Sequence, residues 1–248
     1  MQRRPGLLPA LLLALALTLT GCGAAPPEIG PTGVDELEIP TPSPDAADFV
    51  DGVDHPFLPL APGSRWDYLV AGDPVVVRRV VEVLAENRLV AGVSTTGVLA
   101  TETDENEQTL LERRTWYAQD AAGNVWTLAG EVVRFAAGYE IGREAWEATS
   151  DGAEAGVALL ATPRVGDGYV VAYAEGVAEE RARIVTLGGQ ATVPFGELSD
   201  LLETELTSSL EDATLRTLHA ESIGLVREQA LQDGRRVELV AFEPGSRS

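Results

Sequence analysis

The sequence predicts an all-β domain: a meandering antiparallel sheet of about a dozen strands, folded as a sandwich, a barrel or a half-barrel. Runs rich in β-branched and aromatic residues recur roughly every 8 to 12 residues, and turn residues separate them. No stretch of about 12 residues has the apolar stripe and caps of a helix. Residues 57–248 are enough for one core and too few for clearly two, so we expect a single domain.

The first segment has the three-part layout of a secretory signal peptide. Arg3 and Arg4 precede an apolar run from Leu7 to Leu19, and small residues follow it. The run holds about 13 residues, where roughly 20 are needed to cross a bilayer. We therefore expect residues 1–21 to be an export signal and not a transmembrane helix.

The end of this segment, Leu19-Thr20-Gly21-Cys22, resembles the lipobox of bacterial lipoproteins at all four positions. The resemblance implies cleavage between Gly21 and Cys22, a diacylglycerol on the Cys22 thiol, and further acylation by a fatty acid such as palmitate. Cys22 is the sole cysteine, so no disulfide within one molecule competes for it. Because two or more acyl chains hold stably, the expected location is lipid-anchored on the cell membrane or outer membrane, facing the periplasm or the exterior.

The composition is strongly acidic and lacks lysine. The 18 basic residues are all arginine, against 39 acids, and the formal charge is −21. Nucleic acid and anionic lipid headgroups are therefore poor partners, since both require a basic face. The absence of lysine excludes Schiff-base chemistry, a phosphate-loop lysine and a Ser-Lys hydrolase pair.

Residues 22–56 are predicted to be a disordered tether that follows the lipidated cysteine. From residue 23 onward they contain seven prolines and eight acids but no arginine. Such a composition buries too little apolar surface to fold, and its like charges extend it. We expect it to act as a spacer between the membrane and the folded domain.

The first half of the domain, residues 57–248, shows alternating or β-branched runs separated by turns. Glu86 and Asn87 are expected to form a turn, and the acidic residues 104–107 form a tip. Residues 120–124 read as a hairpin loop, since Gly and Asn accept positive φ. The expected strands are Trp66 to Val70, Val75 to Leu84, Leu89 to Leu99, a run through Trp116 and Tyr117, and Val125 to Ala129.

The second half continues the pattern. Gly138, the pair Glu175 and Gly176, the pair Gly188 and Gly189, and Asp233 with Gly234 are expected turns, and residues 152–163 are expected to be a loop. Residues 198–210 come nearest to a helix, but their Thr and Ser residues favour strand. The expected strands are Val132 to Ala137, Tyr139 to Trp146, Tyr169 to Ala174, Val177 to Leu187, Leu198 to Leu206, Thr214 to Ala220, Ile223 to Ala230 and Arg236 to Phe242.

Several short motifs resemble those of a group of uncharacterised bacterial secreted proteins and lipoproteins. Residues 59–68 (PLAPGSRWDY) match the opening PLxPGxxWxY strand of that group, and residues 223–226 (IGLV) match its closing GxGLV-like hairpin. Residues 116–126 and 193–205 add shorter similarities. The chain differs at residues 219–223, where the group has aromatic residues, proline and glycine. The resemblance implies a β fold and export, and it implies no activity.

The glycine-rich motifs do not indicate an enzyme. Residues 92–97 are one residue too long for a nucleophile elbow and lie in a strand pattern. Residues 166–171 lack the third glycine of the dinucleotide fingerprint and continue into a strand. Both are interpreted as turns.

The histidines are too few for a typical zinc site, because His55 falls in the predicted tether and His219 stands alone. His219 and Glu221 would share one face if the strand extended that far, and a proton-transfer pair is then conceivable. The favoured interpretation of His219 is an ordinary hydrogen-bonding surface residue. On that interpretation, His219→Gln would change stability by no more than about 0.5 kcal/mol.

Carboxylates could serve as a glycosidase pair, but among 39 acids close pairs arise by chance and the sequence selects none. Asp104, Glu105 and Glu107 cluster on one loop together with Asn106, which makes them weak candidates for a cation site. They lack the spacing of a calcium-binding hand. We predict no metal site and no cofactor.

Two functions remain. The favoured one is a non-enzymatic envelope lipoprotein, a monomer, that presents its β domain for protein or glycan contacts. The alternative is a carrier of a lipid or other apolar ligand in a curved-sheet cavity, which the tryptophans and aliphatic residues could line. A large dry cavity would favour the carrier, and a filled core would favour the contact surface. The partner stays unknown.

Overall fold

The structure is a computed structural model, and it describes residues 45–210 and 213–246. All of them belong to one compact unit, residues 38–248. Gly21 and Cys22, and with them the predicted signal peptide and cleavage site, lie outside the described residues. In the described part, no helix has the length and apolar character that crossing a membrane requires.

The described chain is built almost wholly from strands. It begins with one turn of 3-10 helix, η1 (Ala46–Asp48), which Asp45 caps by accepting the Ala47 N–H. The first eight strands are β1 (Phe49–Val50), β2 (Asp54–His55), β3 (Leu58–Pro59), β4 (Arg65–Ala71), β5 (Arg78–Val90), β6 (Val93–Thr103), β7 (Thr109–Asp120) and β8 (Val125–Ala136).

Eight further strands follow without an intervening helix. They are β9 (Tyr139–Glu147), β10 (Glu154–Leu159), β11 (Gly168–Ala174), β12 (Ala178–Val193), β13 (Gly196–Ser208), β14 (Thr214–Ala220), β15 (Gly224–Ala230) and β16 (Arg236–Glu243). The predicted all-β class is confirmed.

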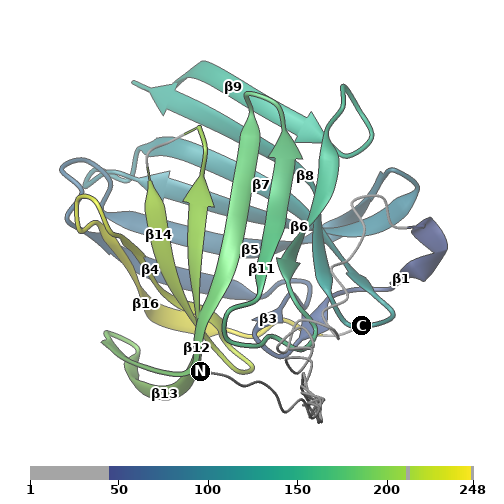
Figure 1. The fold of residues 1–248 in the computed structure, drawn as a ribbon. Helices are drawn as coiled ribbons and strands as arrows, with labels where there is room; N and C mark the ends of the chain where they lie inside the picture. The colour runs from purple at the N-terminus through teal and green to yellow at the C-terminus, as the bar shows by residue number, and fades with distance from the viewer. Residues whose placement is uncertain (1–44, 211–212, 247–248) are drawn as a thin grey trace, which may run out of the picture. The chain divides into compact units, whose positions relative to one another are not determined.

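Fourteen of the strands form one antiparallel sheet that curls round on itself (Figure 1). Because β7 pairs with both β6 and β8, twelve strands close into a barrel in the order β7-β6-β5-β4-β16-β15-β14-β13-β12-β11-β10-β8. Two strands add to this ring: β1 beside the end of β7, and β9 beside β8. Among the predicted alternatives, the observed fold is therefore the barrel.

Cross-strand register shows which side chains face the interior. Trp66, Tyr68 and Val70 on β4 are buried, whereas Leu69 between them is 47% exposed. Residues paired across neighbouring strands point to the same face of the sheet. Trp66 points inward and is paired with Val81, which is paired with Ala100, which in turn is paired with Arg113 on β7. This ladder places Arg113 inside the barrel.

One end of the barrel is closed by the plug, defined as residues 53–60 with the β2–β3 hairpin. The Ser222 N–H donates to the Pro56 carbonyl at 2.7 Å, and the plug is joined to β7 by Asp54 and Gln119. Above it the interior is filled by fully buried aliphatic side chains, among them Leu128, Ile184, Leu202, Val226 and Leu239. Figure 1 shows β3 at this closed end and β9 at the opposite end, which we call the mouth.

The tip of the β12–β13 hairpin bends against the outside of the barrel. Its ladder shifts register three times, and the Phe195 N–H donates to the Leu239 carbonyl of β16 at 2.9 Å. A Cβ on Gly189 would lie 3.1 Å from both Leu218 Cδ2 and the Leu201 carbonyl oxygen. Glycine at this position thus lets the hairpin pack over Leu218.

The folded unit begins earlier than the predicted boundary at residue 57. Residues 45–56, assigned to the tether, form η1, β1 and β2, and His55 is only 3% exposed. These residues are ordered by tertiary contacts and not by local composition: Phe49 packs edge-on against Trp126, and His55 bonds the main chain of Leu160. Residues 22–44 lie outside the described part.

Two predicted turns are wrong. Residues 86 and 87 lie inside β5, where the ladder shifts register, and the real turn is Ala91 and Gly92 with φ values of 50° and 80°. Gly188 and Gly189 lie inside β12 at its bend, and the chain turns at residues 194 and 195.

The predicted loop at residues 152–163 contains a strand, β10. Its small residues are required by packing, because a Cβ on Gly156 would lie 2.3 Å from the Val171 carbonyl carbon. Glycine therefore allows β10 to lie close to β11. This packing requirement explains why a strand here contains the small residues that made the segment resemble a loop.

Candidate functional site

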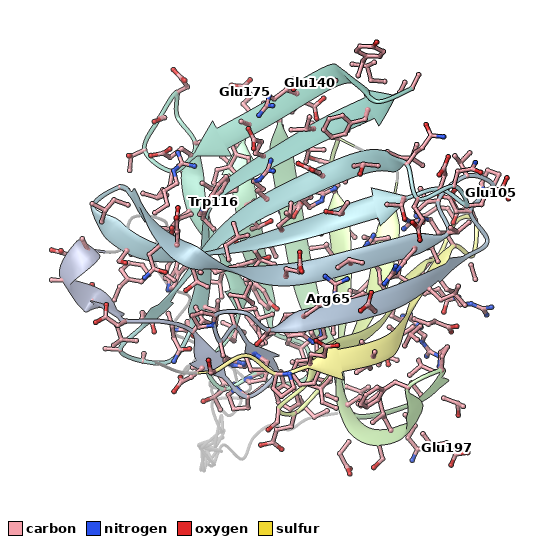
Figure 2. All side chains as sticks on the ribbon, turned by 180° about the vertical axis from the view of Figure 1, so that it is seen from behind. Arg65, Glu105, Trp116, Glu140, Glu175 and Glu197 are labelled. Atoms are coloured by element: carbon pink, nitrogen blue, oxygen red, sulfur yellow. The ribbon has the colours of Figure 1, made fainter. Side chains whose placement is uncertain are left out.

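The mouth of the barrel is lined by polar side chains that point inward. Figure 2 shows Glu140 of β9 and Glu175 of the β11–β12 turn near this end, whereas Glu197 lies at the opposite end. Registry places Glu102, Thr204, Thr217 and Glu228 on the same inner face as the apolar core. The interior thus changes from apolar near the plug to polar near the mouth.

Five charged residues on this inner wall form one network, the charge cluster, which consists of Asp73, Arg79, Glu102, Glu228 and Arg235. Arg79 donates to Glu102 at 2.8 Å and to both carboxylate oxygens of Glu228 at 3.2 Å. Arg235 donates to Asp73 at 3.0 Å and to Glu102 at 2.9 Å. The cluster joins strands β5, β6 and β15 with Asp73 in the turn after β4 and Arg235 in the turn before β16.

Electrostatics favours the charged forms of Arg79 and Glu228. Burial alone would lower the Arg79 pKa, but the carboxylates of Glu228 and Glu102 outweigh it and raise the pKa. Burial alone would raise the Glu228 pKa, but Arg79 outweighs it and lowers the pKa. Buried Tyr68 donates to the Leu225 carbonyl at 2.9 Å, and burial raises its pKa.

The facing wall contains a second polar group on β7 and β12. Arg113 is exposed at the mouth. Its charge acts on two neighbours, lowering the pKa of Glu228 and opposing the rise that burial causes in the pKa of Tyr117. The Tyr117 hydroxyl is hydrogen-bonded to Thr115, and Glu180 lies close to it.

A cavity of about 70 Å³ lies beside β8 on this wall. We call it the β8 cavity. Its inner-face lining consists of Arg113, Thr115, Thr127, Gly130, Val132, Glu144, Trp146, Ala172, Ala178 and Glu180, and Arg114, Glu131 and Val177 complete the lining. Thr127 is 5% exposed, and its buried hydroxyl has no hydrogen-bond partner among the described residues. An unsatisfied buried hydroxyl costs roughly 1–3 kcal/mol, so this atom is available to a ligand or to water.

A larger hollow, about 440 Å³, opens at the bent tip of the β12–β13 hairpin. It is lined by Gln190, Ala191, Thr192, Glu197, Leu198 and Ser199, which are mostly polar. It lies outside the barrel, so neither hollow is a large apolar cavity within the sheet.

The predicted cation candidates are on the β6–β7 turn. Asp104 uses one oxygen to accept the N–H groups of Asn106 and Gln108, each at 2.9 Å, and so caps its own turn. Glu105 and Glu107 are exposed beside it. Nowhere in residues 45–210 and 213–246 do three His, Cys, Asp or Glu side chains gather as metal ligands would.

Both histidines face the interior: His55 is buried, and His219 is partly buried with its Nδ1 enclosed. His55 accepts the Phe57 N–H at Nδ1 (3.2 Å) and lies 3.0 Å from the Leu160 carbonyl at Nε2, an arrangement that assigns the proton to Nε2. His219 Nδ1 is buried and has no partner in the described part. The interpretation of His219 as a surface residue is therefore wrong, and Glu221 lies in the turn after β14, so the two do not share a strand face.

The polar interior was not identified from sequence. Arg79, Glu102 and Glu228 occupy inward positions of strands whose other inward residues are mostly apolar. This contrast can be seen in the sequence only when it is known which residues of each strand face inward. Arg113 is flanked by the polar residues Glu112, Arg114 and Thr115. The sequence therefore shows no alternation of apolar and polar residues that would identify Arg113 as inward-facing. The ladder register was needed to bring these residues together.

No protein-family model matches the sequence, and no curated protein matches it. Among solved structures, one from Bacteroides fragilis, described as a proposed exported protein with a YmcC-like fold, aligns with a TM-score of 0.45 and 13% identity over 76% of this chain and 99% of that one. A proposed lipoprotein from Parabacteroides distasonis aligns with a TM-score of 0.40 and 9% identity over 78% of this chain and 100% of that one. Both scores lie below 0.5, so the proposals for this chain rest on its own residues.

Proposed function

We propose that this chain is a membrane-anchored lipoprotein of the bacterial cell envelope, and that it works by binding and not by catalysis. Its lipid anchor is Cys22, and its barrel presents the mouth to a protein or glycan. The lipobox and export signal support the anchor, while the polar lining of the mouth supports the binding site.

The proposal that the mouth faces the partner rests on one observation: the described chain enters the barrel at its closed end. β1 pairs with Asp120 and Gln119 at the end of β7, and the plug follows immediately. A tether of about 23 residues, from residue 22 to residue 45, has a reach of roughly 25 Å at 5 to 6 Å per root residue. Because the described chain starts at the closed end, we propose that the mouth, at the other end, is the part of the barrel left open to partners.

The filled lower half of the barrel favours a contact surface over an apolar carrier. Pockets for small apolar ligands measure roughly 300–1,000 Å³, whereas the β8 cavity measures about 70 Å³ and is bordered by charged groups. An acyl chain would have to displace packed residues such as Leu202 and Val226, both of which are fully buried.

Site-specific crosslinking in the native envelope tests the proposal. Cys22 is the sole natural cysteine, so Tyr139→Cys on exposed β9 gives one new thiol at the mouth for a photoreactive maleimide. Glu197→Cys, at the opposite end, is the matched control (Figure 2). We expect Tyr139→Cys to give a discrete adduct with an envelope protein or glycan that Glu197→Cys does not give. Identical adducts from both positions, or none from Tyr139→Cys, would contradict the proposal.

A further inference from the structure

We infer that the β8 cavity is a subsite for the exocyclic group of one neutral sugar residue, whose ring remains in the mouth. The inference rests on the proposed binding function and names the ligand class. It starts from the unpartnered Thr127 hydroxyl, which is buried in the cavity wall and can both donate and accept.

The size of the cavity limits what can enter. A water molecule needs about 10–15 Å³ of such volume, so 70 Å³ accommodates only a few water-sized groups. A complete pyranose ring is too large, but a hydroxymethyl or acetamido group fits. A ligand must therefore enter by one end, from the side of the mouth.

The lining favours a neutral ligand with several hydroxyl groups. Arg113 offers donors only, while the hydroxyls of Thr115 and Thr127 can donate and accept. Ligand hydroxyls match all three because each one donates and accepts. The lining contains the carboxyl groups of Glu144 and Glu180 as well as the Arg113 guanidinium, so a small anion and a small cation would each meet a group of like charge.

The charges also argue against a zwitterion. Glu144 already pairs with Arg134 at 3.2 Å, and Glu180 has an interaction of its own in the structure. An ammonium group would compete with these contacts.

Trp146 supplies the apolar side of the subsite. Its indole is half-buried and packs among Ala153, Ala172, Ala174 and Ala178, with Nε1 against Gly130. Ligand sites combine an aromatic wall with a few placed polar groups, and the C–H faces of sugars pack well on indole rings. Trp146 fluorescence thus gives a signal for occupancy.

Titration of the full mature lipoprotein in a sugar-free detergent tests the inference, with saturation-transfer NMR and calorimetry as readouts. The probes are glucose, galactose, mannose and N-acetylglucosamine, with glycine as the zwitterionic comparison. We expect at least one sugar to bind with a Kd of about 1–10 mM. Binding of glycine in place of every sugar, or of no probe at all, would overturn the inference.

Variants separate binding from folding. Arg113→Gln should weaken sugar binding about tenfold, while Arg183→Gln on the outer face should leave it unchanged. Thr127→Val removes the unsatisfied hydroxyl in nearly the same shape, so it should weaken binding without lowering the melting temperature, and Thr127→Ser should retain binding. Sugar binding that is insensitive to Arg113→Gln and Thr127→Val would place the site elsewhere.

Failure of the sugar subsite and failure of the proposed function give different results. If no sugar binds but Tyr139→Cys still gives its adduct, the mouth contacts a different partner and only the sugar subsite is wrong. If sugars bind as expected but the adduct is absent, the subsite stands and the presentation of the mouth in the envelope is wrong.

Discussion

Arg79 and Glu228, which are 149 residues apart in sequence, form a two-point ion pair across the inner wall of the barrel. Nη1 and Nη2 of Arg79 each lie 3.2 Å from one oxygen of the Glu228 carboxylate. Both side chains are mostly buried, at 16% and 15% exposure. The pair joins β5 to β15, two strands that share no ladder.

Removing one partner should destabilise the barrel strongly. In Arg79→Met, the carboxylates of Glu228 and Glu102 lose one of the two arginines that they share, the other being Arg235, and we expect a loss of about 3 kcal/mol in the free energy of unfolding. Urea denaturation at pH 7 measures it. The pKa of Glu228 should then rise, so the loss should shrink as the pH falls below 4.5, its ordinary value, and the carboxylate becomes protonated.

The neighbouring arginine is the matched control. Arg78 points to the outside of β5, is 50% exposed and pairs with Asp67. Exposed pairs contribute roughly 0–1 kcal/mol, so Arg78→Met should cost at most about 1 kcal/mol. Equal losses for the two variants would show that the inward position of Arg79 has no special role.

A second prediction concerns the close contact between Gly130 and Trp146. A Cβ on Gly130 would lie 2.6 Å from Trp146 Nε1, so Gly130→Ala must displace the indole. We expect a loss of about 1–3 kcal/mol from overpacking, together with a change in tryptophan fluorescence. Gly142→Ala on β9 has nothing within 4 Å of the added methyl group and serves as control. Unchanged fluorescence in Gly130→Ala would contradict the packing described for Trp146.

A third prediction concerns the anchor, which lies outside the described residues. The mature protein should begin at Cys22 and have the mass of the lipidated chain, and it should partition into the detergent phase. Cys22→Ala should remain in the aqueous phase, because two or more acyl chains supply stable membrane binding. Intact mass spectrometry and phase partition measure both. Equal partition of both proteins would remove the anchor from the proposed function.

Local patterns were sufficient for most of the strands but not for the barrel's closure. Thr214 to Ala220 was bounded correctly because alternation and turn residues mark both of its ends. The turn expected at residues 86 and 87 was wrong because Asn87 also fits a ladder irregularity, and only tertiary pairing decides between them. The barrel closes because β7 pairs with β8 as well as with β6. The sequence of an individual strand does not show which other strands it pairs with.

The candidate site was harder to predict for a related reason. An inward arginine such as Arg79 is chemically the same as an outward one such as Arg78, and in a chain with 39 acids no pairing stands out. His55 was misplaced because seven nearby prolines dominate the composition, whereas its burial depends on Leu160, 105 residues away. Contacts of that separation lie beyond what composition and periodicity can show.

The last prediction follows from His219 and His55, which both face the interior. Burial lowers the pKa of His219 to about 4, and the nearby His55 adds to this by disfavouring a second positive charge. Burial also lowers the His55 pKa. In the unfolded chain both should titrate near 6.5. Between about pH 6.5 and pH 4 the unfolded state therefore binds protons that the folded state does not, so stability falls as the pH falls through this window.

The shift of His219 alone corresponds to at most roughly 3 kcal/mol. His219→Gln should therefore differ little from wild type at pH 8 and should lose less stability on acidification to pH 4.5, where wild type is penalised. Chemical denaturation at half-unit pH steps measures the difference between the two proteins, which removes the contribution of the carboxylates they share. A difference that stays constant from pH 8 to pH 4.5 would mean that His219 is not neutral in the folded barrel, and its unpartnered Nδ1 would then need a proton acceptor at the plug.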